Sequence, residues 1–432
     1  MLPLVLGALA VLSASACGVL IGHEDLPERS HGPDGGADGA PPRGVDGSLD
    51  AIHPAGTLDR TFGDQGFTTL EWPTLTVPPS LMLDGEDILL VLTASKPGLA
   101  IVRCSKSGVC DTSHPMKPEP SSVSRVVPVR DLGGGVGLFY GLQSADPERE
   151  YENIAHLWRS TRDGGAEHLA QETLTAPTTQ LEIAFATSPL RSVGVNNGGP
   201  RGAGRVNVRA FLQDGSPDML FGQGGLVARA LPVPYFVPND VLLHDDGRIV
   251  VAGMAEAVMW MRFEKNGAVD TSFGTKDGVG TSNLASEIRE IVLDDGGYIA
   301  GGSHSDTPRG VLLRLDRDGR IDPSYWNGGM YRFEISADGL RPPLALVGAM
   351  ALGAGGSVLA FGSTSATETG VVTLSRVSRS GLDTSFAQNG YAYIEEGEIG
   401  GRASMVIQPD GKAVVTWLSA EHVVKLARFW VQ

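Results

Sequence analysis

One short stretch of this 432-residue chain has the residue types of a calcium-binding loop. Asp316, Asp318 and Asp322 lie close together in the run "DRDGRID", and closely spaced carboxylates are typical ligands of Ca²⁺. The related runs "EKNGAVD" and "SKSGVCD" keep only the last of these aspartates, and the Glu expected at the far end of a full loop is absent. We therefore interpret the run as a tight turn between strands, and we predict no metal site.

The other reactive side chains have no spacing that assigns a reaction. The nine histidines are scattered without the paired spacing of zinc ligands, and the sequence has no phosphate-binding loop, dinucleotide fingerprint or Gly-x-Ser-x-Gly motif. No pair of carboxylates can be placed at an acid–base separation before the fold is known. We predict no catalytic residue and no cofactor, although a central channel could still gather residues from distant parts of the chain.

Two of the three cysteines, Cys104 and Cys110, lie six residues apart in "CSKSGVC". Aligned with the related turns, Cys104 takes the position of Phe263 and Cys110 takes that of Val269. Residues that flank a turn in this way face each other with Cβ atoms about 4–5.5 Å apart, close to what a disulfide needs. We predict a Cys104–Cys110 disulfide. The alternative is two reduced cysteines packed as small apolar residues.

The third cysteine, Cys17, follows an apolar segment that begins at Leu2 and ends in "LSASAC". An apolar run that ends in small residues is typical of a secretory signal. The segment also resembles the signal of bacterial lipoproteins, which implies a lipid on Cys17 and a place at the outer membrane or cell surface. Two alternatives stay open: a plainly cleaved signal, giving a periplasmic or secreted protein, and an uncleaved anchor over residues 2–22.

Composition separates a tether from a globular head. Residues 18–55 are rich in Gly, Pro and Asp without apolar periodicity, so we predict a disordered tether between the signal at residues 1–17 and a head at residues 56–432. The whole chain is 41% hydrophobic and 19% charged, with a formal net charge of −16. Such an acidic chain repels phosphate backbones, so we exclude nucleic acid as a partner. We expect a monomer.

A phrase of the pattern Asp-x-x-Phe-Gly recurs along the head. It occurs as "LDRTFG", "PDMLFG", "VDTSFG", "IDPSYW" and "LDTSFA", and four of its aspartates, from Asp218 to Asp383, are separated by 52, 52 and 61 residues. Each phrase follows β-rich stretches that are joined by glycine turns, and a four-stranded unit with a period near 50 residues is the signature of a β-propeller. We expect the Asp to accept turn N–H groups, the aromatic ring to pack between units, and the Gly to relieve the bend.

The number of units and the two chain ends predict how the ring closes. The first hairpin turn of each unit falls near one of seven positions, which are Gly85, Gly134, Pro189, Gly247, Gly296, Gly355 and Gly411. The last unit has no fourth strand, whereas residues 56–70 resemble a fourth strand without a unit before it. We predict an all-β, seven-bladed β-propeller of four-stranded blades, in which the N-terminal strand completes the C-terminal blade and removes an exposed edge.

The phrase, the "PDGK" hairpin and the pattern Arg-x-x-x-x-Gly-x-x-Asp together resemble the delta-60 repeat of bacterial surface proteins. The resemblance covers residues 56–432. It implies a β-propeller, but it implies no activity and supplies no catalytic residues.

One face of such a propeller carries short, uniform glycine turns, and the other carries loops of varying length and sequence. Repeat proteins vary the loops of their binding face. Aromatic side chains on that face are candidate anchors for a partner, or else packing residues between blades; they are Trp72, Tyr151, Tyr235 and Phe236. We predict a non-catalytic surface protein that binds a protein or glycan through these loops. The alternative is a propeller enzyme, a hydrolase or lyase acting on a sugar or lactone in the central channel.

Overall fold

The protein is built almost entirely of β-strands. The computed structural model describes residues 53–72, 79–93, 99–116, 125–129, 137–146, 149–160, 166–175, 183–187, 191–197, 204–304, 309–334, 344–364, 370–398, 403–419 and 423–432. In these ranges the one helical element is the 3-10 turn η1 (Ala354–Gly356), and no helix is long and apolar enough to cross a membrane. Cys17 and residues 18–52 of the expected tether lie outside the described residues.

Five sheets of four antiparallel strands carry most of the described chain, and in each the strands pair in sequence order. The first contains β2 (Ser80–Asp84), β3 (Asp87–Thr93), β4 (Leu99–Cys104) and β5 (Cys110–Met116). The second contains β6 (Arg125–Val129), β7 (Gly137–Asp146), β8 (Arg149–Ser160) and β9 (Ala166–Thr175). The third contains β10 (Ile183–Thr187), β11 (Ser192–Asn197), β12 (Arg205–Phe211) and β13 (Leu226–Ala230). The fourth contains β14 (Val237–Leu243), β15 (Ile249–Met254), β16 (Val258–Phe263) and β17 (Val279–Ser282). The fifth contains β18 (Glu287–Asp294), β19 (Gly297–His304), β20 (Arg309–Asp316) and β21 (Met330–Arg332).

A sixth, nine-stranded sheet consists of two groups joined by a short contact. One group holds β22 (Leu346–Leu352), β23 (Val358–Ser363), β24 (Gly370–Ser378), β25 (Gly381–Leu382) and β26 (Tyr391–Glu398). The other holds β27 (Ser404–Ile407), β28 (Lys412–Ser419), β29 (Val424–Trp430) and the N-terminal strand β1 (Phe67–Leu70). Only two residue pairs, at the end of β26, connect the groups. The expected all-β architecture of repeated four-stranded antiparallel sheets is thus confirmed for the described residues.

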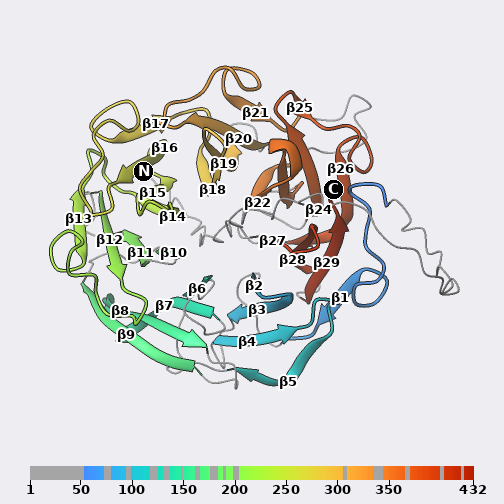
Figure 1. Cartoon of the computed structure of the whole chain (residues 1–432), viewed down its shortest axis with the longest axis horizontal. Helices are drawn as coiled ribbons and strands as arrows, with labels where there is room; N and C mark the ends of the chain where they lie inside the picture. The colour runs from blue at the N-terminus through green and yellow to red at the C-terminus, as the bar shows by residue number, and fades with distance from the viewer. Residues whose placement is uncertain are drawn as a thin grey trace, which may run out of the picture.

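The sheets are arranged in a ring, with the first strand of each unit innermost (Figure 1). Contacts between inner strands form a closed series, in which β2 contacts β6, β6 contacts β10, β10 contacts β14, β14 contacts β18, β18 contacts β22, β22 contacts β27, and β27 contacts β2. The first and last described segments meet in this ring, because β1 pairs with β29 from Phe67 opposite Ala427 to Leu70 opposite Val424.

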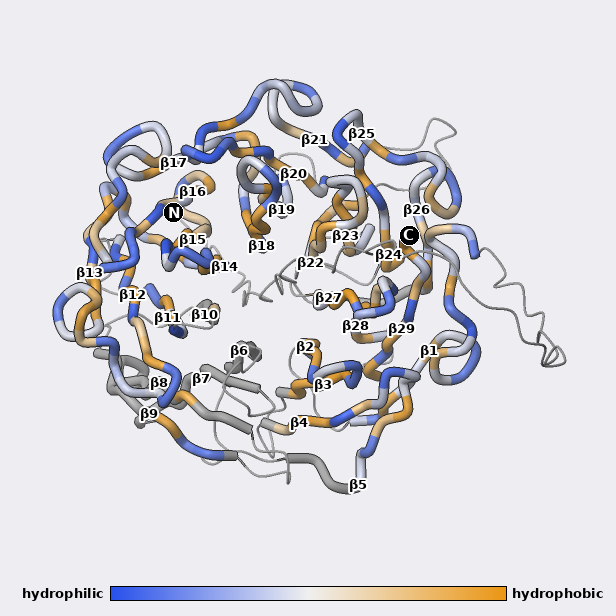
Figure 2. Tube along the Cα trace, viewed as in Figure 1, coloured by the Kyte–Doolittle hydropathy of each residue, from blue (hydrophilic) through white to orange (hydrophobic). Residues whose placement is uncertain are grey.

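The hydrophobic core is divided among the seams between neighbouring sheets. One cluster joins β10–β13 to β14–β17 and includes Phe221 and Met261, and the next joins β14–β17 to β18–β21 and includes Trp260. Figure 2 shows apolar residues concentrated along the strands and hydrophilic residues at the outer turns. The second strand of a unit is buried on both faces, as in β23, where every residue is buried. Each sheet is therefore stabilised chiefly by its two neighbours.

The aspartate of the repeated phrase has the expected role in its turn. Asp270 Oδ1 accepts a hydrogen bond from the backbone N–H of Ser272 at 3.0 Å and another from the Ser272 hydroxyl at 2.6 Å. The same bonds to the residue two positions on are made by Asp59, Asp322 and Asp383. This local bond holds the chain at the start of the outer strand.

The second oxygen of most of these aspartates binds an arginine that also lies over the aromatic ring of the phrase. Asp270 Oδ2 is 2.7 Å from Arg262 NH2, and the Arg262 guanidinium carbon is 4.4 Å from the centre of the buried Phe273 ring. The same trio recurs as Asp59–Arg428–Phe62, Asp218–Arg191–Phe221 and Asp383–Arg376–Phe386. We call this Asp–Arg–aromatic trio the clasp.

Each clasp also reaches the next sheet. Arg262 NH1 donates to the carbonyl of Arg317 at 2.6 Å, and Gly274 N–H donates to the carbonyl of Asp318 at 2.6 Å, in the turn between β20 and β21. Gly274 has a φ of 76°, which a glycine adopts without strain. At the equivalent position of two other phrases, Ala387 has a φ of 45° and Trp326 has a φ of 47°. The clasp therefore fastens one sheet to the turn of its neighbour.

We predict that removing the N-terminal strand destabilises the head. A chain that begins at residue 53 keeps the β1–β29 pairing and the buried Asp59–Arg428 ion pair, whereas a chain that begins at residue 71 loses both, together with buried Phe62. Because breaking a buried ion pair and exposing a sheet edge are both costly, we expect the shorter chain to melt at least about 5 °C lower in differential scanning calorimetry. Equal melting temperatures would contradict the prediction.

Candidate functional site

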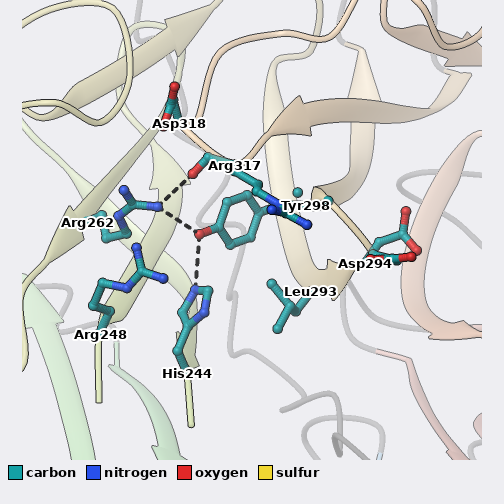
Figure 3. Close-up of a pocket in the computed structure, with 11 residues that line it drawn as sticks. His244, Arg248, Arg262, Leu293, Asp294, Tyr298, Arg317 and Asp318 are labelled. Carbon is teal, nitrogen blue, oxygen red and sulfur yellow. Dashed lines mark hydrogen bonds between the residues drawn. The ribbon is translucent and has the colours of Figure 1, made fainter. Parts of the chain in front are cut away.

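A pocket opens between the fourth and fifth sheets, on the side of the uniform glycine turns. Its volume is about 600 Å³, which is within the range of about 300–1,000 Å³ typical of small-ligand sites. The turn between β14 and β15, the turn between β18 and β19, and the turn between β20 and β21 form its walls (Figure 3). Its polar lining includes His244, Arg248, Arg262, Tyr298, Arg317 and Asp318.

A hydrogen-bonded chain of three side chains crosses the floor of this pocket. Arg262 NH1 donates to the Tyr298 hydroxyl at 3.2 Å, and the Tyr298 hydroxyl lies 3.0 Å from His244 Nε2 (Figure 3). An arginine can only donate, so the hydroxyl oxygen accepts from Arg262. In the tautomer of neutral His244 that leaves Nε2 unprotonated, the hydroxyl donates its proton to that nitrogen. The Tyr298 ring also packs edge-to-face against His244 and Phe273.

Burial fixes the charge states of this chain. Burial, followed by the positive charges of Arg248 and Arg262, lowers the pKa of His244 to about 4, although Asp246 opposes the shift. Burial also raises the pKa of Tyr298 above its ordinary value, against the effect of Arg262. Near neutral pH, His244 is neutral and Tyr298 is protonated, so neither side chain is poised to exchange a proton with a ligand.

Arg262 is held by groups on both sides of the seam. Burial alone would lower the pKa of Arg262, but the hydrogen bonds to Tyr298 and Asp270 outweigh burial and raise that pKa above its ordinary value. The hydrogen bonds from Ser272 and Arg262 likewise outweigh burial and lower the pKa of Asp270. At the rim, Arg317 and Asp318 are exposed, and Arg248 pairs with Asp246. A ligand in this pocket would meet charged groups at the rim above a floor of neutral His244, neutral Tyr298 and the positively charged Arg262.

Two buried carboxyl groups lie on the inner strands. Burial raises the pKa of Asp240 to about 8, against the N–H groups of Ile291 and Val241. Burial, and then the charge of Asp240, raises the pKa of Glu290 well above its ordinary value. Raised carboxyl pKa values can mark catalytic acids. Here, however, Asp240 binds Ile291 N–H of the next inner strand at 2.8 Å, and Glu290 binds Met350 N–H of the strand after that. Both side chains connect inner strands and are closed to solvent.

The structure gives Asp316 the role of a turn residue. Its Oδ1 accepts the backbone N–H groups of Asp318 and Arg320 at 2.9 and 2.8 Å, and Arg320 pairs with Asp318. In the described ranges, no three His, Cys, Asp or Glu side chains are grouped closely enough to hold a metal ion.

Cys104 and Cys110 face each other at the ends of β4 and β5. They form a register pair, as do Phe263 with Val269 in the fourth sheet, so the alignment that placed them at facing positions agrees with the fold. Their sulfur atoms are 1.96 Å apart, joined as a disulfide. Whether the mature protein carries this bond stays a prediction, which a thiol count on denatured, unreduced protein tests.

The four candidate aromatic anchors have different surroundings. Phe236 is 2% exposed and packs in the core cluster between the third and fourth sheets, so its assignment as a possible partner anchor is wrong, because the link before β14 turns this ring inward. Trp72 is partly buried against the cluster that includes Leu70. Tyr235 is 46% exposed and donates from its hydroxyl to the carbonyl of Ala255 at 2.7 Å. Tyr151 lies in β8, and nothing further is described of its side chain.

The pocket at His244 and Tyr298 was not predicted from the sequence. The sequence does hold one signal, since Tyr298 takes the position that Ile249 takes in the preceding unit. The strand partners show this equivalence: Ile249 pairs with Phe263, and Tyr298 pairs with Leu315 at the matching position of the next unit. A hydroxyl at a position otherwise occupied by an aliphatic side chain requires a partner, which the preceding sheet provides.

Comparisons with known proteins give a distant structural likeness and no family. No protein-family model matches the sequence, and no curated protein is significantly similar. A Penicillium chrysogenum alpha-L-arabinanase in complex with arabinobiose is 11% identical, with 84% of this chain and 95% of that chain covered and a TM-score of 0.45. A neuraminidase-like protein of A/little yellow-shouldered bat/Guatemala is 9% identical, with 71% and 94% covered and a TM-score of 0.42. A Bacteroides caccae protein of unknown function is 12% identical, with 74% and 94% covered and a TM-score of 0.40. Likeness at this level assigns the chain neither a family nor an activity.

We predict that His244 makes the head less stable in acid. Its pKa falls from 6.5 to about 4 on folding, so the unfolded chain takes up the proton first. The contribution of His244 is fully present above about pH 6.5 and is lost as the pH falls towards 4. His244→Gln keeps an acceptor for Tyr298 but does not titrate. Between about pH 7 and pH 4.5, the variant should lose about 2 kcal/mol less unfolding free energy than the parent chain. Urea unfolding at both pH values measures this, and parallel losses would contradict it.

Proposed function

We propose that this protein is a non-catalytic, surface-displayed binding protein of the delta-60 type that recognises a protein or a glycan. One observation carries the proposal: four buried side chains with shifted pKa values are bonded to the scaffold. Asp240 and Glu290 bind neighbouring strands, and His244 and Tyr298 bind each other. Groups that are fully engaged in the fold favour binding over acid–base catalysis.

We propose further that the ring is a seven-bladed β-propeller closed by its N-terminal strand. The closed series of inner-strand contacts supports this number of blades. The pairing of β1 with β29 supports the closure. Two contacts at the last seam, between the strand group β22–β26 and the two chain ends, also support the closure. Arg376 donates to the carbonyl of Val431, and the backbone N–H of Ala387 donates to the carbonyl of Ala55. There, residues from the two ends of the chain take the place of one continuous turn.

The first residues of the chain are the basis for proposing display outside the cell. We propose that Cys17 carries a lipid, that the residues between Cys17 and the head form the tether, and that the head is a monomer anchored at the outer membrane or cell surface. The Cys104–Cys110 pair fits an oxidising compartment. Mass spectrometry of the mature N-terminus would reveal a lipid on Cys17.

The binding face of this proposal is the side of the varying loops. Tyr235 supports it, because nearly half of its surface is exposed on the link that precedes β14. Trp72 supports it less strongly, since it also packs against the core. The alternative function is a hydrolase or lyase that acts on a sugar or lactone in the central channel.

We predict that the purified head captures a surface protein or glycan without converting it. Tyr235→Ala should weaken capture about tenfold, as expected for an aromatic anchor. Leu220→Ala is the matched control, because Leu220 is 89% exposed but lies in a clasp turn. Capture is measured by surface-immobilised binding, and turnover by product release from glycoside and lactone substrates.

Catalytic turnover of any of these substrates by the head would contradict the proposal and favour the enzyme. Equal effects of Tyr235→Ala and Leu220→Ala on capture would remove the proposed binding face.

A further inference from the structure

One clasp differs from all the others described. In the fifth sheet the phrase is Asp322-Pro-Ser-Tyr325-Trp326, with Trp where three other phrases have Gly. The arginine over the Tyr325 ring, Arg314, forms its ion pair with Asp294 instead of with the aspartate of the phrase. This seam is therefore held differently from its neighbours.

Trp326 occupies a backbone conformation that its side chain does not favour. Its φ is 47°, in the left-handed region where a bulky residue is a true outlier and costs of the order of 1–2 kcal/mol. Such strain persists where the surroundings hold it in place, and it is concentrated at functional sites. Here the indole N–H donates to the carbonyl of Ser378 at 2.9 Å, which orients the ring across the seam to the next sheet.

The indole forms part of an aromatic group on the outer rim of the seam. The Trp326 ring centre lies 5.8 Å from that of Tyr325 and 6.0 Å from that of Tyr331. Tyr331 in turn packs edge-to-face on Phe333 at 5.0 Å. Trp326 and Tyr331 are partly exposed, while Phe333 is buried beneath them. The partly exposed rings therefore rest on a rigid apolar base.

The rings of Trp326 and Tyr331 line a second pocket of about 600 Å³, next to the hairpin that joins β24 to β25. Its polar walls carry both donors and acceptors. Arg332 and Arg379 supply guanidinium groups, and Arg379 stacks over Tyr325 at 4.4 Å. Glu334 pairs with Arg309, yet 67% of its side chain is exposed, and Asn327 is exposed as well.

We infer that this pocket binds a saccharide. The apolar C–H face of a sugar ring packs against an aromatic ring, and its hydroxyl groups both donate and accept hydrogen bonds. Trp326 and Tyr331 supply the aromatic surface, while carboxylate, amide and guanidinium groups surround it. A proline-rich peptide also binds aromatic grooves, but its prolines have no N–H to donate to Glu334, so the mixed lining favours the sugar.

This inference deepens the proposed binding function and rests on it, but it concerns the outer rim, not the varying loops. The two can fail separately. A head that binds sugars at the rim while Tyr235→Ala has no effect would refute the loop face alone, and a head that captures a partner through its loops but binds no sugar would refute the rim site alone.

The test uses the full chain with Trp326→Gly. This variant restores the glycine of the common phrase and relieves the left-handed backbone, so it should fold while lacking the indole surface. Ala387→Gly makes the same backbone change at the equivalent position of the next unit, and is the matched control. Binding is measured by calorimetry against soluble hexasaccharides of glucose, xylose, N-acetylglucosamine and galacturonic acid, and against a proline-rich decapeptide.

We expect at least one hexasaccharide to bind the parent chain. Trp326→Gly should weaken that binding about tenfold or more, and Ala387→Gly should leave it unchanged. The neutral and acidic sugars in the panel show whether the arginines contribute a charge preference. The inference is overturned if no sugar in the panel binds, if only the peptide binds, or if Trp326→Gly and Ala387→Gly have the same effect.

Discussion

The ring depends on one repeated interaction, in which an arginine pairs with an aspartate and lies over an aromatic ring at the seam between sheets. Asp270 binds its own turn with one oxygen and Arg262 with the other, and Arg262 continues to the turn of the next sheet. Burying two charges is costly unless the pair and its remaining hydrogen-bonding groups find partners. The turn, the ring and the neighbouring carbonyl provide those partners. The clasp therefore joins neighbouring sheets through charged and polar groups as well as through their apolar side chains.

The clasp also determines where chemistry can occur in this fold. The arginines and aspartates of the clasps are engaged at the seams, so a side chain that one unit adds to the repeat can supply a group that the clasps do not use. Tyr298 adds a hydroxyl to one seam and creates the hydrogen-bonded floor of the pocket beside His244. Trp326 replaces a glycine at the next seam and creates the aromatic rim pocket. Each pocket lies where one unit carries a side chain that a sister unit lacks, Tyr298 at the position of Ile249 and Trp326 at that of Gly274.

Much of the architecture could be predicted from the sequence, because the repeat is a local pattern. The alternating apolar stretches and glycine turns predicted the four-stranded sheets, and the phrase around Asp270 predicted both the turn bond and the buried ring. The pairing positions of Cys104 and Cys110 followed from alignment with sister turns. The pockets could not be predicted in this way, because His244 and Tyr298 belong to different sheets and their contact depends on how those sheets dock. The error at Phe236 has a related cause, since the direction of a ring in a link depends on the seam it meets.

The most direct test of the clasp is a double-mutant cycle on Arg262 and Asp270 in the head. Arg262→Met keeps the apolar stem, and Asp270→Asn keeps an acceptor for Ser272. The unfolding free energies of the parent, the two single variants and the double variant are measured by urea denaturation. If the pair fastens the seam, the two changes together should cost less than the sum of the single changes, with a coupling energy of about 2 kcal/mol or more. Additive losses, within about 0.5 kcal/mol, would contradict the account.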